Sequence, residues 1–208
     1  MAREKIMPEE FLFIADTHQY FLNGRELIAV TYAFEKCGIT DFSKVPFDAL
    51  EPARIRGDYV HQMAAYFGAE MLDEESIDPA LTGYLEAIRS YYNEEVEKVF
   101  EIEKPVYSLT HGYAGTPDLI FLNHKGELCL DDFKTPTKIH PATKFQTAAY
   151  VYAWEKMNKK RIVHRRGVML RGDGTYELDQ HKNPLRRDFD DFLSILKTAI
   201  IKIREKIK

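Results

Sequence analysis

The segment LCLDDFKT, residues 128–135, constrains the fold more than any other part of the sequence. Its first half is an apolar run typical of a buried strand, and Asp131, Asp132 and Lys134 follow within four positions. A buried charge is costly unless it is paired or bound to a metal ion. The chain must therefore fold so that a partner group or a cation meets these charges.

A hairpin supplies candidates for that partner. Side chains alternate along a strand, so Asp132 and Lys134 share one face while Asp131 points to the other. The preceding apolar segment is joined to this strand by a predicted turn, NHKG at 123–126. Counting outward from the turn brings Asp118 to about the level of the two later aspartates. Two carboxylates are thus expected to converge beside a lysine.

Carboxylates held together repel each other, which raises the pKa of one of them unless a cation intervenes. Oxygen ligands without a cysteine cluster suit Mg²⁺ or Mn²⁺ better than Zn²⁺. The backbone carbonyl of Phe133 is a further candidate ligand, and the Lys134 ammonium is suited to hold a water or a phosphate oxygen. The alternative is a structural ion pair of Lys134 with Asp118 and Asp132, without any metal.

The composition is that of one globular domain spanning residues 1–208, with 45% hydrophobic residues. No apolar stretch is long enough for a membrane span, and MAREKIMPEEF does not resemble a signal peptide, so we expect a cytoplasmic protein without membrane contact. The two cysteines, Cys37 and Cys129, are too few for a disulfide framework and exclude a four-cysteine iron–sulfur cluster.

The net charge of −4 excludes a surface that binds polyanions as a whole, so any contact with nucleic acid must be local. Basic residues cluster at 159–166, which includes Arg165 and Arg166, at 186–187 and in the tail at 200–208. Arg165 and Arg166 are the candidates for contact with nucleic acid. A solvated charged face is the alternative interpretation.

Hydrophobic periodicity and turn residues predict the order of elements. We expect a β-hairpin around Asn23-Gly24, helices at 51–68 and 79–100, strands within 101–122 and at 127–134, a helix at 142–157, strands at 161–170 and 175–179, and a helix at 184–206. The last helix should bury Phe189, Phe192, Leu193, Leu196, Ile200 and Ile203. This order predicts an α/β fold with a central mixed sheet flanked by helices.

Three short motifs occur together in this frame. Pro117-Asp118 and Asp132-Phe133-Lys134 lie on the predicted hairpin, Gln146 and Tyr150 form QxxxY on the next helix, and Gly57 and His61 form GxxxH on an earlier one. The set resembles the PD-(D/E)xK nucleases, and in particular their RecB-type branch, which includes phage recombination exonucleases. The opening THQYFLNGRELIAVT also looks like the N-terminal hairpin of phage members.

The resemblance implies a restriction-endonuclease-like core with an N-terminal β-hairpin. It implies Asp118, Asp132 and His61 as metal ligands, Lys134 as the catalytic lysine, and Gln146 and Tyr150 as contacts to the site or the nucleic-acid backbone. A further glutamate completes many such sites; Glu103 is the candidate and Glu101, on the same predicted strand face, is its rival. His61 as an ordinary core or surface histidine, and Gln146 and Tyr150 as packing residues, are the alternatives.

The function expected from this resemblance is hydrolysis of DNA with Mg²⁺ or Mn²⁺, from an end, in phage or bacterial recombination or repair. A structure-specific endonuclease and a non-catalytic DNA-binding subunit are the rival functions. A recombinase or single-strand-binding partner and assembly into a homo-oligomer are further expectations.

Overall fold

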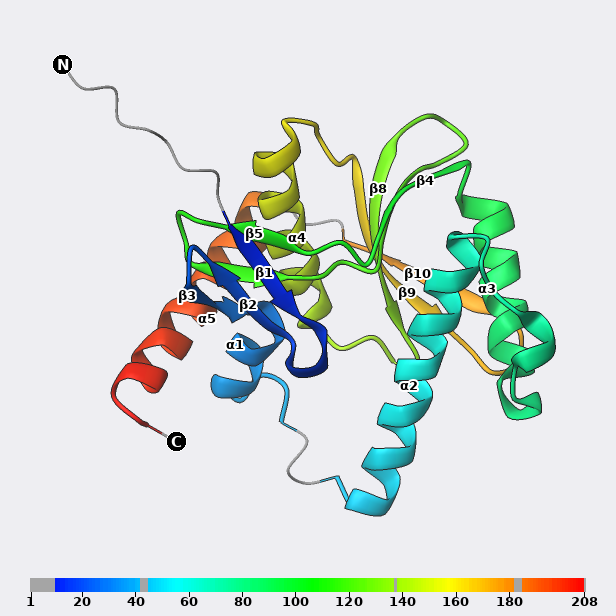
Figure 1. Ribbon diagram of the computed structural model, residues 1–208, viewed down its shortest axis with the longest axis horizontal. Coiled ribbons are helices and arrows are strands. Elements are labelled where there is room, and N and C mark those ends of the chain that lie inside the picture. The colour runs from blue at the N-terminus through cyan, green and yellow to red at the C-terminus, as the bar shows by residue number, and fades with distance from the viewer. Residues whose placement is uncertain (1–9, 42–44, 137, 182–184, 208) are drawn as a thin grey trace.

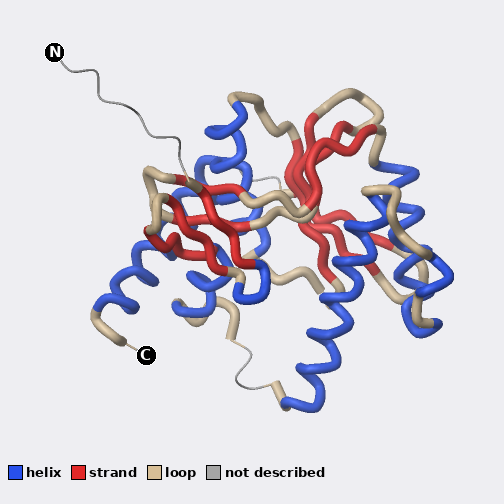
Figure 2. Tube along the Cα trace, in the orientation of Figure 1, coloured by secondary structure: helices blue, strands red, loops and turns tan. Residues whose placement is uncertain are grey.

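The computed structural model describes residues 10–41, 45–136, 138–181 and 185–207, and within them the chain forms two five-stranded mixed sheets and five α-helices (Figures 1 and 2). The predicted mixed α/β class is confirmed. The strands divide between two sheets, where the sequence pattern suggested one. The N-terminal segment that lacks a signal-peptide pattern lies mostly outside the described residues, and so does Pro184, the predicted start of the last helix.

The first sheet has the order β1-β2-β3-β6-β5. Its strands are β1 (Phe11–Ile14), β2 (Gln19–Leu22), β3 (Arg25–Ala29), β5 (Val106–Ser108) and β6 (Tyr113–Gly115). The hairpin predicted from Asn23-Gly24 is confirmed: both residues have positive φ, 51° and 76°, and Leu22 pairs with Arg25. Two consecutive residues with positive φ match the twist of the flanking strands. The hairpin joins the rest of the sheet through the parallel pair β3 and β6.

The second sheet has the order β10-β9-β8-β7-β4. Its strands are β4 (Lys98–Ile102), β7 (Leu119–Leu122), β8 (Leu128–Lys134), β9 (His164–Leu170) and β10 (Tyr176–Gln180). The predicted hairpin of β7 and β8 is confirmed, with Leu119 opposite Asp131. Strands β8 and β9 are parallel, and the crossover between them contains a helix.

One predicted helix boundary was wrong. The helix predicted to reach residue 100 ends at Glu95, because the apolar residues after it pair as β4 with β7. The strand region 101–122 contains four strands, because the chain turns at Glu103 and at Gly112, which have positive φ of 44° and 71°. These turns send β5 and β6 to the first sheet, and β4 and β7 to the second.

The helices are α1 (Val30–Lys36), α2 (Phe47–Gly68), α3 (Thr82–Glu95), α4 (Thr143–Asn158) and α5 (Leu185–Arg204), with short 3-10 turns at Ala15–Thr17, Glu74–Ser76 and Pro79–Leu81. Helices α2 and α3 lie beside the second sheet (Figure 1) and share a core with it. Helix α4 contacts strands of both sheets and packs against α5. Among the described residues, no helix is long and apolar enough to cross a membrane.

The predicted inward face of the last helix is confirmed in part. Phe189, Phe192 and Leu196 are buried against α4 and its neighbours. Ile200 and Ile203 are 38% and 39% exposed, so the prediction was wrong for the last turns of α5. The apolar period continues there, but no neighbouring element covers that part of the helix completely.

Candidate active site

Asp118 connects the two halves of the hairpin motif. It lies just before β7, and its Oδ2 accepts a hydrogen bond of 2.5 Å from the backbone N–H of Phe133 on β8. Since Leu119 is opposite Asp131, Asp118 lies beside Asp132, as the hairpin register predicts. The prediction that the Phe133 carbonyl binds a metal ion stays a prediction.

Asp131 points to the opposite face of β8, as the alternation of the strand predicts. It is fully buried and accepts hydrogen bonds from Arg166 and, at 2.6 Å, from the Tyr91 hydroxyl. Arg166 also pairs with Glu95 at 2.6 Å. This network compensates the charge of Asp131. The charge of Asp132, on the other face of β8, needs a partner of its own.

Asp132 is paired with the Lys134 ammonium. The side chains are 2% and 24% exposed, so the lysine forms the outer part of the pair. Burial raises the pKa of Asp132 to about 6, and the nearby Asp118 charge adds to this effect against the opposing influence of Lys134. A carboxyl group with such a pKa gains from a cation that replaces or joins its lysine partner.

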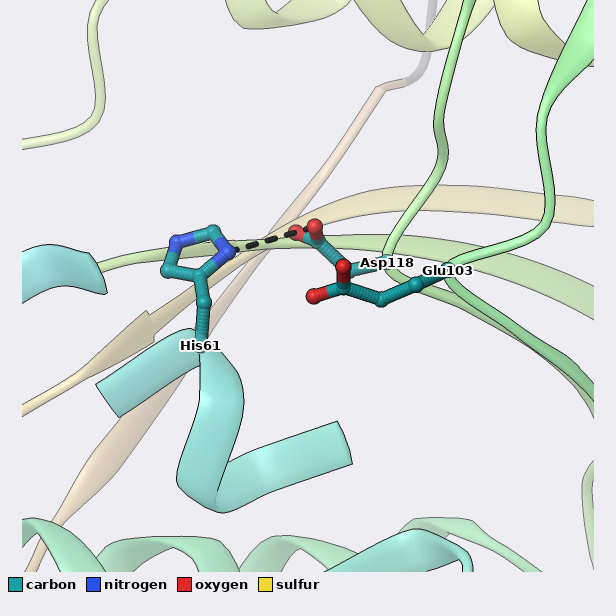
Figure 3. A group of neighbouring side chains, drawn as sticks. All are labelled: His61, Glu103 and Asp118. Carbon is teal, nitrogen blue, oxygen red and sulfur yellow. Dashed lines mark hydrogen bonds and ion pairs between the residues drawn. The ribbon is translucent and has the colours of Figure 1, made fainter. Parts of the chain in front are cut away.

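His61 extends from α2 toward Asp118 (Figure 3), and its Nδ1 lies 3.2 Å from Asp118 Oδ1. Burial alone would lower the pKa of His61, but the charge and hydrogen bond of Asp118 outweigh it and raise the pKa. The same partners hold the pKa of Asp118 below its usual value despite its burial. On the same helix, Ala64 and Gly68 lie against Tyr92 of α3.

Glu103 and Glu101 are separated by the turn that follows β4. Glu101 accepts hydrogen bonds of 2.6 Å from Trp154 Nε1 and Lys104 Nζ, away from the cluster around Asp118. Glu103 is exposed, adopts a positive φ and lies near Asp118; partial desolvation of its carboxylate, followed by that neighbouring charge, raises its pKa. The expectation that the two glutamates share a strand face was wrong, because Glu103 lies beyond the end of the strand.

His61, Glu103 and Asp118 form a group whose potential ligand atoms all lie within 4.8 Å of one another (Figure 3). One imidazole nitrogen and two carboxylates are donors that suit Mn²⁺ or Mg²⁺. The group is partly open to solvent, since the side chains of His61 and Asp118 are 29% and 11% exposed. The donor set and its spacing therefore fit a divalent ion, and Asp132 is the next carboxylate alongside.

Gln146 and Tyr150 lie on one face of α4, as QxxxY predicts. Both are buried, and Gln146 Nε2 donates a hydrogen bond of 3.1 Å to the Tyr150 hydroxyl. The Tyr150 ring packs so closely on Gly115 that a Cβ there would lie 2.3 Å from it. Burial and then the charge of Asp132 raise the pKa of Tyr150.

The structure corrects the prediction that Arg165 and Arg166 contact nucleic acid. Both are 6% exposed, whereas contact with nucleic acid requires accessible guanidinium groups. Arg165 pairs with Asp188 of α5, and Arg166 pairs with Asp131. The basic run 159–166 places them on β9 inside the fold, where they neutralise buried carboxylates. A basic cluster in the sequence cannot distinguish such pairs from an exposed patch.

Two hydroxyl groups near the cluster were missed by the sequence analysis. Tyr20 of β2 and Thr116, in the segment before Asp118, have oxygens 3.0 Å apart. Thr116 directly precedes the Pro117-Asp118 pair, and this position was a signal for it. Tyr20 lies 96 residues earlier, and only the parallel pairing of β3 with β6 brings its sheet to that segment.

No protein-family model and no curated protein matches the chain. A solved structure of a protein named a putative exonuclease, from Eubacterium rectale, is similar with a TM-score of 0.53 and 11% identity, over 85% of this chain and 82% of that one. The chain shares the fold of that protein. An alkaline exonuclease from Laribacter hongkongensis has a TM-score of 0.41 and 15% identity, over 86% of this chain and 92% of that one.

Proposed function

We propose that this protein is a PD-(D/E)xK nuclease of the RecB-type branch that hydrolyses DNA from its ends with Mg²⁺ or Mn²⁺. The observation that carries the proposal is the grouping of His61, Glu103 and Asp118 within 4.8 Å, beside the pair of Asp132 and Lys134. Five side chains from α2, the loop after β4 and the β7–β8 hairpin meet there. The structure from Eubacterium rectale that shares the fold is named a putative exonuclease, which supports the same activity.

His61, Glu103 and Asp118, with Asp132, are the proposed ligands. They would hold a divalent ion, which would supply a Lewis acid to polarise a phosphodiester and to lower the pKa of bound water from about 15.7 toward 7. Glu103 accounts better for the completing glutamate than Glu101, whose carboxylate is held by Trp154 and Lys104.

Lys134 is the proposed catalytic lysine. Its ammonium is tied to Asp132, which fixes the direction of the side chain, and 24% exposure leaves part of it accessible. It is therefore suited to donate a hydrogen bond to the attacking water or to a phosphate oxygen. Gln146 and Tyr150, both buried, are proposed to support the site itself and not to contact the DNA backbone, with the Tyr150 hydroxyl positioned by Gln146.

The biological setting is proposed from the resemblance alone. It is DNA recombination or repair in the cytoplasm of a bacterium or a phage-infected cell. A recombinase or a single-strand-binding protein is the proposed partner, and a homo-oligomer is the proposed assembly. Pull-down from a cell that expresses the protein, and its mass in solution, would test these proposals.

The activity is tested with end-labelled linear DNA and covalently closed circular DNA, each with Mn²⁺, with Mg²⁺ and with a chelator. We expect degradation of the linear DNA only, and none with the chelator. Cleavage of the circle would replace the proposal with an endonuclease. Binding of DNA without turnover in either metal would replace it with a non-catalytic DNA-binding subunit.

A further inference from the structure

We propose that the protein forms a two-fold dimer in which the C-terminal segment 200–207 of each copy binds in a groove of the other copy. The groove lies between the N-terminal hairpin, α1 and the end of α5, which Figure 1 shows together on the side of the molecule away from α2 and α3. The inference rests on the homo-oligomer proposed above and assigns a surface to it, without depending on the nuclease activity.

The groove has the size and lining of a site for a polypeptide segment. Its volume is about 1380 Å³, larger than the roughly 300–1,000 Å³ of a typical small-molecule pocket. Strand β3 lines one side of it, and α1 and α5 line the other. The apolar residues of the lining are Leu27, Ile28, Ala29, Tyr32, Ile200 and Ile203.

The apolar stripe of α5 continues past the part of the helix that the fold covers. Leu196 is buried, whereas Ile200 and Ile203, at helical spacing from it, are 38% and 39% exposed. Ile207, just beyond the end of the helix, is 53% exposed. Exposed apolar side chains gathered in one place are typical of a site that binds another protein.

The edge strand of the hairpin extends this apolar surface. Leu12 and Ile14 of β1 are 54% and 38% exposed. Ile14 lies opposite Gln19 of β2, so the two side chains share one face of the sheet, and Gln19 lines the groove. The exposed apolar surface therefore runs from the edge strand, across the groove, to the end of α5.

The charges of the groove and of the C-terminal segment are complementary. Among the lining residues, the acidic side chains Glu26, Glu35 and Asp41 outnumber the basic one, Arg204. The segment 200–207, IIKIREKI, carries three basic residues and a single acidic one between its isoleucines. Opposite charges across an interface select the partner and its orientation. The chain thus carries, on its own C-terminal segment, the apolar and basic groups that the groove fits.

A two-fold arrangement follows from the position of the segment. Ile200 and Ile203 are part of the groove wall and also part of the proposed occupant, so the same patch is used on both copies and the assembly closes at two chains. Along β2, Gln19 faces the groove, while Tyr20 faces the other side, where its hydroxyl reaches Thr116 near Asp118. The dimer therefore leaves the candidate active site open.

The mass of the full chain in solution, measured by sedimentation equilibrium without DNA, tests the proposal. We expect the wild type to have twice the mass of one chain. Ile203→Glu should raise the dissociation constant at least about 100-fold, because it places a charge at two positions of a two-fold apolar interface. Ile55→Glu is the matched control: Ile55 of α2 is 41% exposed but lies outside the groove, so association should be unchanged.

Exchange of charges tests whether the occupant is a second copy. Glu35 lines the groove, and Lys206 lies in the C-terminal segment. Glu35→Lys and Lys206→Glu should each weaken self-association at least about tenfold, because each places like charges across the interface. An equimolar mixture of the two variants should restore it, because both contacts of the mixed dimer again join opposite charges.

A wild type with the mass of one chain would overturn the proposal and leave the groove to a different protein. A mass above that of two chains would overturn the two-fold arrangement, and failure of the mixture to restore association would overturn the binding of the segment in the groove. Cleavage of linear DNA by Ile203→Glu should match that of the wild type, so failure of the nuclease proposal would be recognised separately. Circular dichroism would verify the fold of each variant, and the charge-exchange pair decides the matter even where Ile203→Glu is unstable.

Discussion

Asp118 Oδ2 accepts a hydrogen bond of 2.5 Å from the backbone N–H of Phe133, the residue between Asp132 and Lys134. This bond fixes the relative position of two short motifs that lie on different strands. The Asp118 side chain is thereby directed toward His61 by its other oxygen, at 3.2 Å. The candidate site depends on this connection, because it aligns carboxylates from both strands on one side of the sheet.

Lys134→Ala should reduce cleavage of linear DNA at least about 100-fold, because it removes the donor proposed to act on the attacking water or the phosphate. The fold and the affinity for Mn²⁺ should be retained, and circular dichroism and titration calorimetry would measure them. Lys125→Ala is the matched control, since Lys125 is exposed in the β7–β8 turn. Full activity of Lys134→Ala would remove the catalytic assignment.

Glu103→Gln and Glu101→Gln should affect different properties: Mn²⁺ binding in the first variant, and the free energy of unfolding in the second. Loss of a ligand charge in Glu103→Gln should weaken Mn²⁺ binding about 10- to 100-fold, by comparison with the loss of groups that support metal ligands. Glu101→Gln should leave Mn²⁺ binding unchanged but lower the free energy of unfolding by about 1–2 kcal/mol, because the Trp154 N–H loses a charged acceptor. The reverse pattern would assign the site to Glu101.

Arg166→Met should lower the free energy of unfolding by about 3–5 kcal/mol, because it leaves the buried carboxylate of Asp131 without its cation. Urea denaturation would measure the change. Arg171→Met is the control: the pair of Arg171 with Glu177 is exposed, so the change should be at most about 1 kcal/mol. A loss of DNA affinity in Arg166→Met, with stability unchanged, would contradict the structural role given to Arg166.

Affinity for Mn²⁺ should rise with pH between about 5 and 8, because the ligands must lose protons to bind a cation. The pKa of Asp132 is raised to about 6 by its burial, and the pKa of His61 is also raised by Asp118. Below the pKa of a ligand, the proton that this ligand must release should lower the Mn²⁺ affinity about tenfold for each unit by which the pH falls. Calorimetric titrations at several pH values would measure this slope, and a flat profile would exclude Asp132 and His61 as ligands.

In the metal-free protein, the contribution of Asp132 to the free energy of unfolding should fall as the pH rises. A carboxyl group whose pKa is higher in the folded state stabilises the fold at low pH. For Asp132 this contribution is complete below about 3.8 and is lost as the pH rises through about 6. Asp132→Asn should remove that part of the pH dependence. Urea denaturation of both proteins in the presence of a chelator would measure it, and parallel profiles would contradict the shifted pKa.

The hairpin and its alternation could be predicted from the sequence because they depend on local signals. A turn at 123–126 and the period of two along β8 suffice to separate Asp131 from Asp132. The division into two sheets could not be predicted, because it depends on turns at Glu103 and Gly112 whose positive φ is adopted within the folded chain. The roles of Arg165 and Arg166 were missed for a related reason: their partners, Asp188 and Asp131, are distant in the sequence.

The proposed metal site is tested most directly by the position of Mn²⁺ in crystals of the protein grown with this ion, located by its anomalous scattering. We expect an ion bonded to the imidazole of His61 and to carboxylate oxygens of Asp118 and Asp132, with Glu103 as a further ligand, and its loss in Asp118→Asn. Crystals at saturating Mn²⁺ in which no ion contacts Asp118 would contradict it.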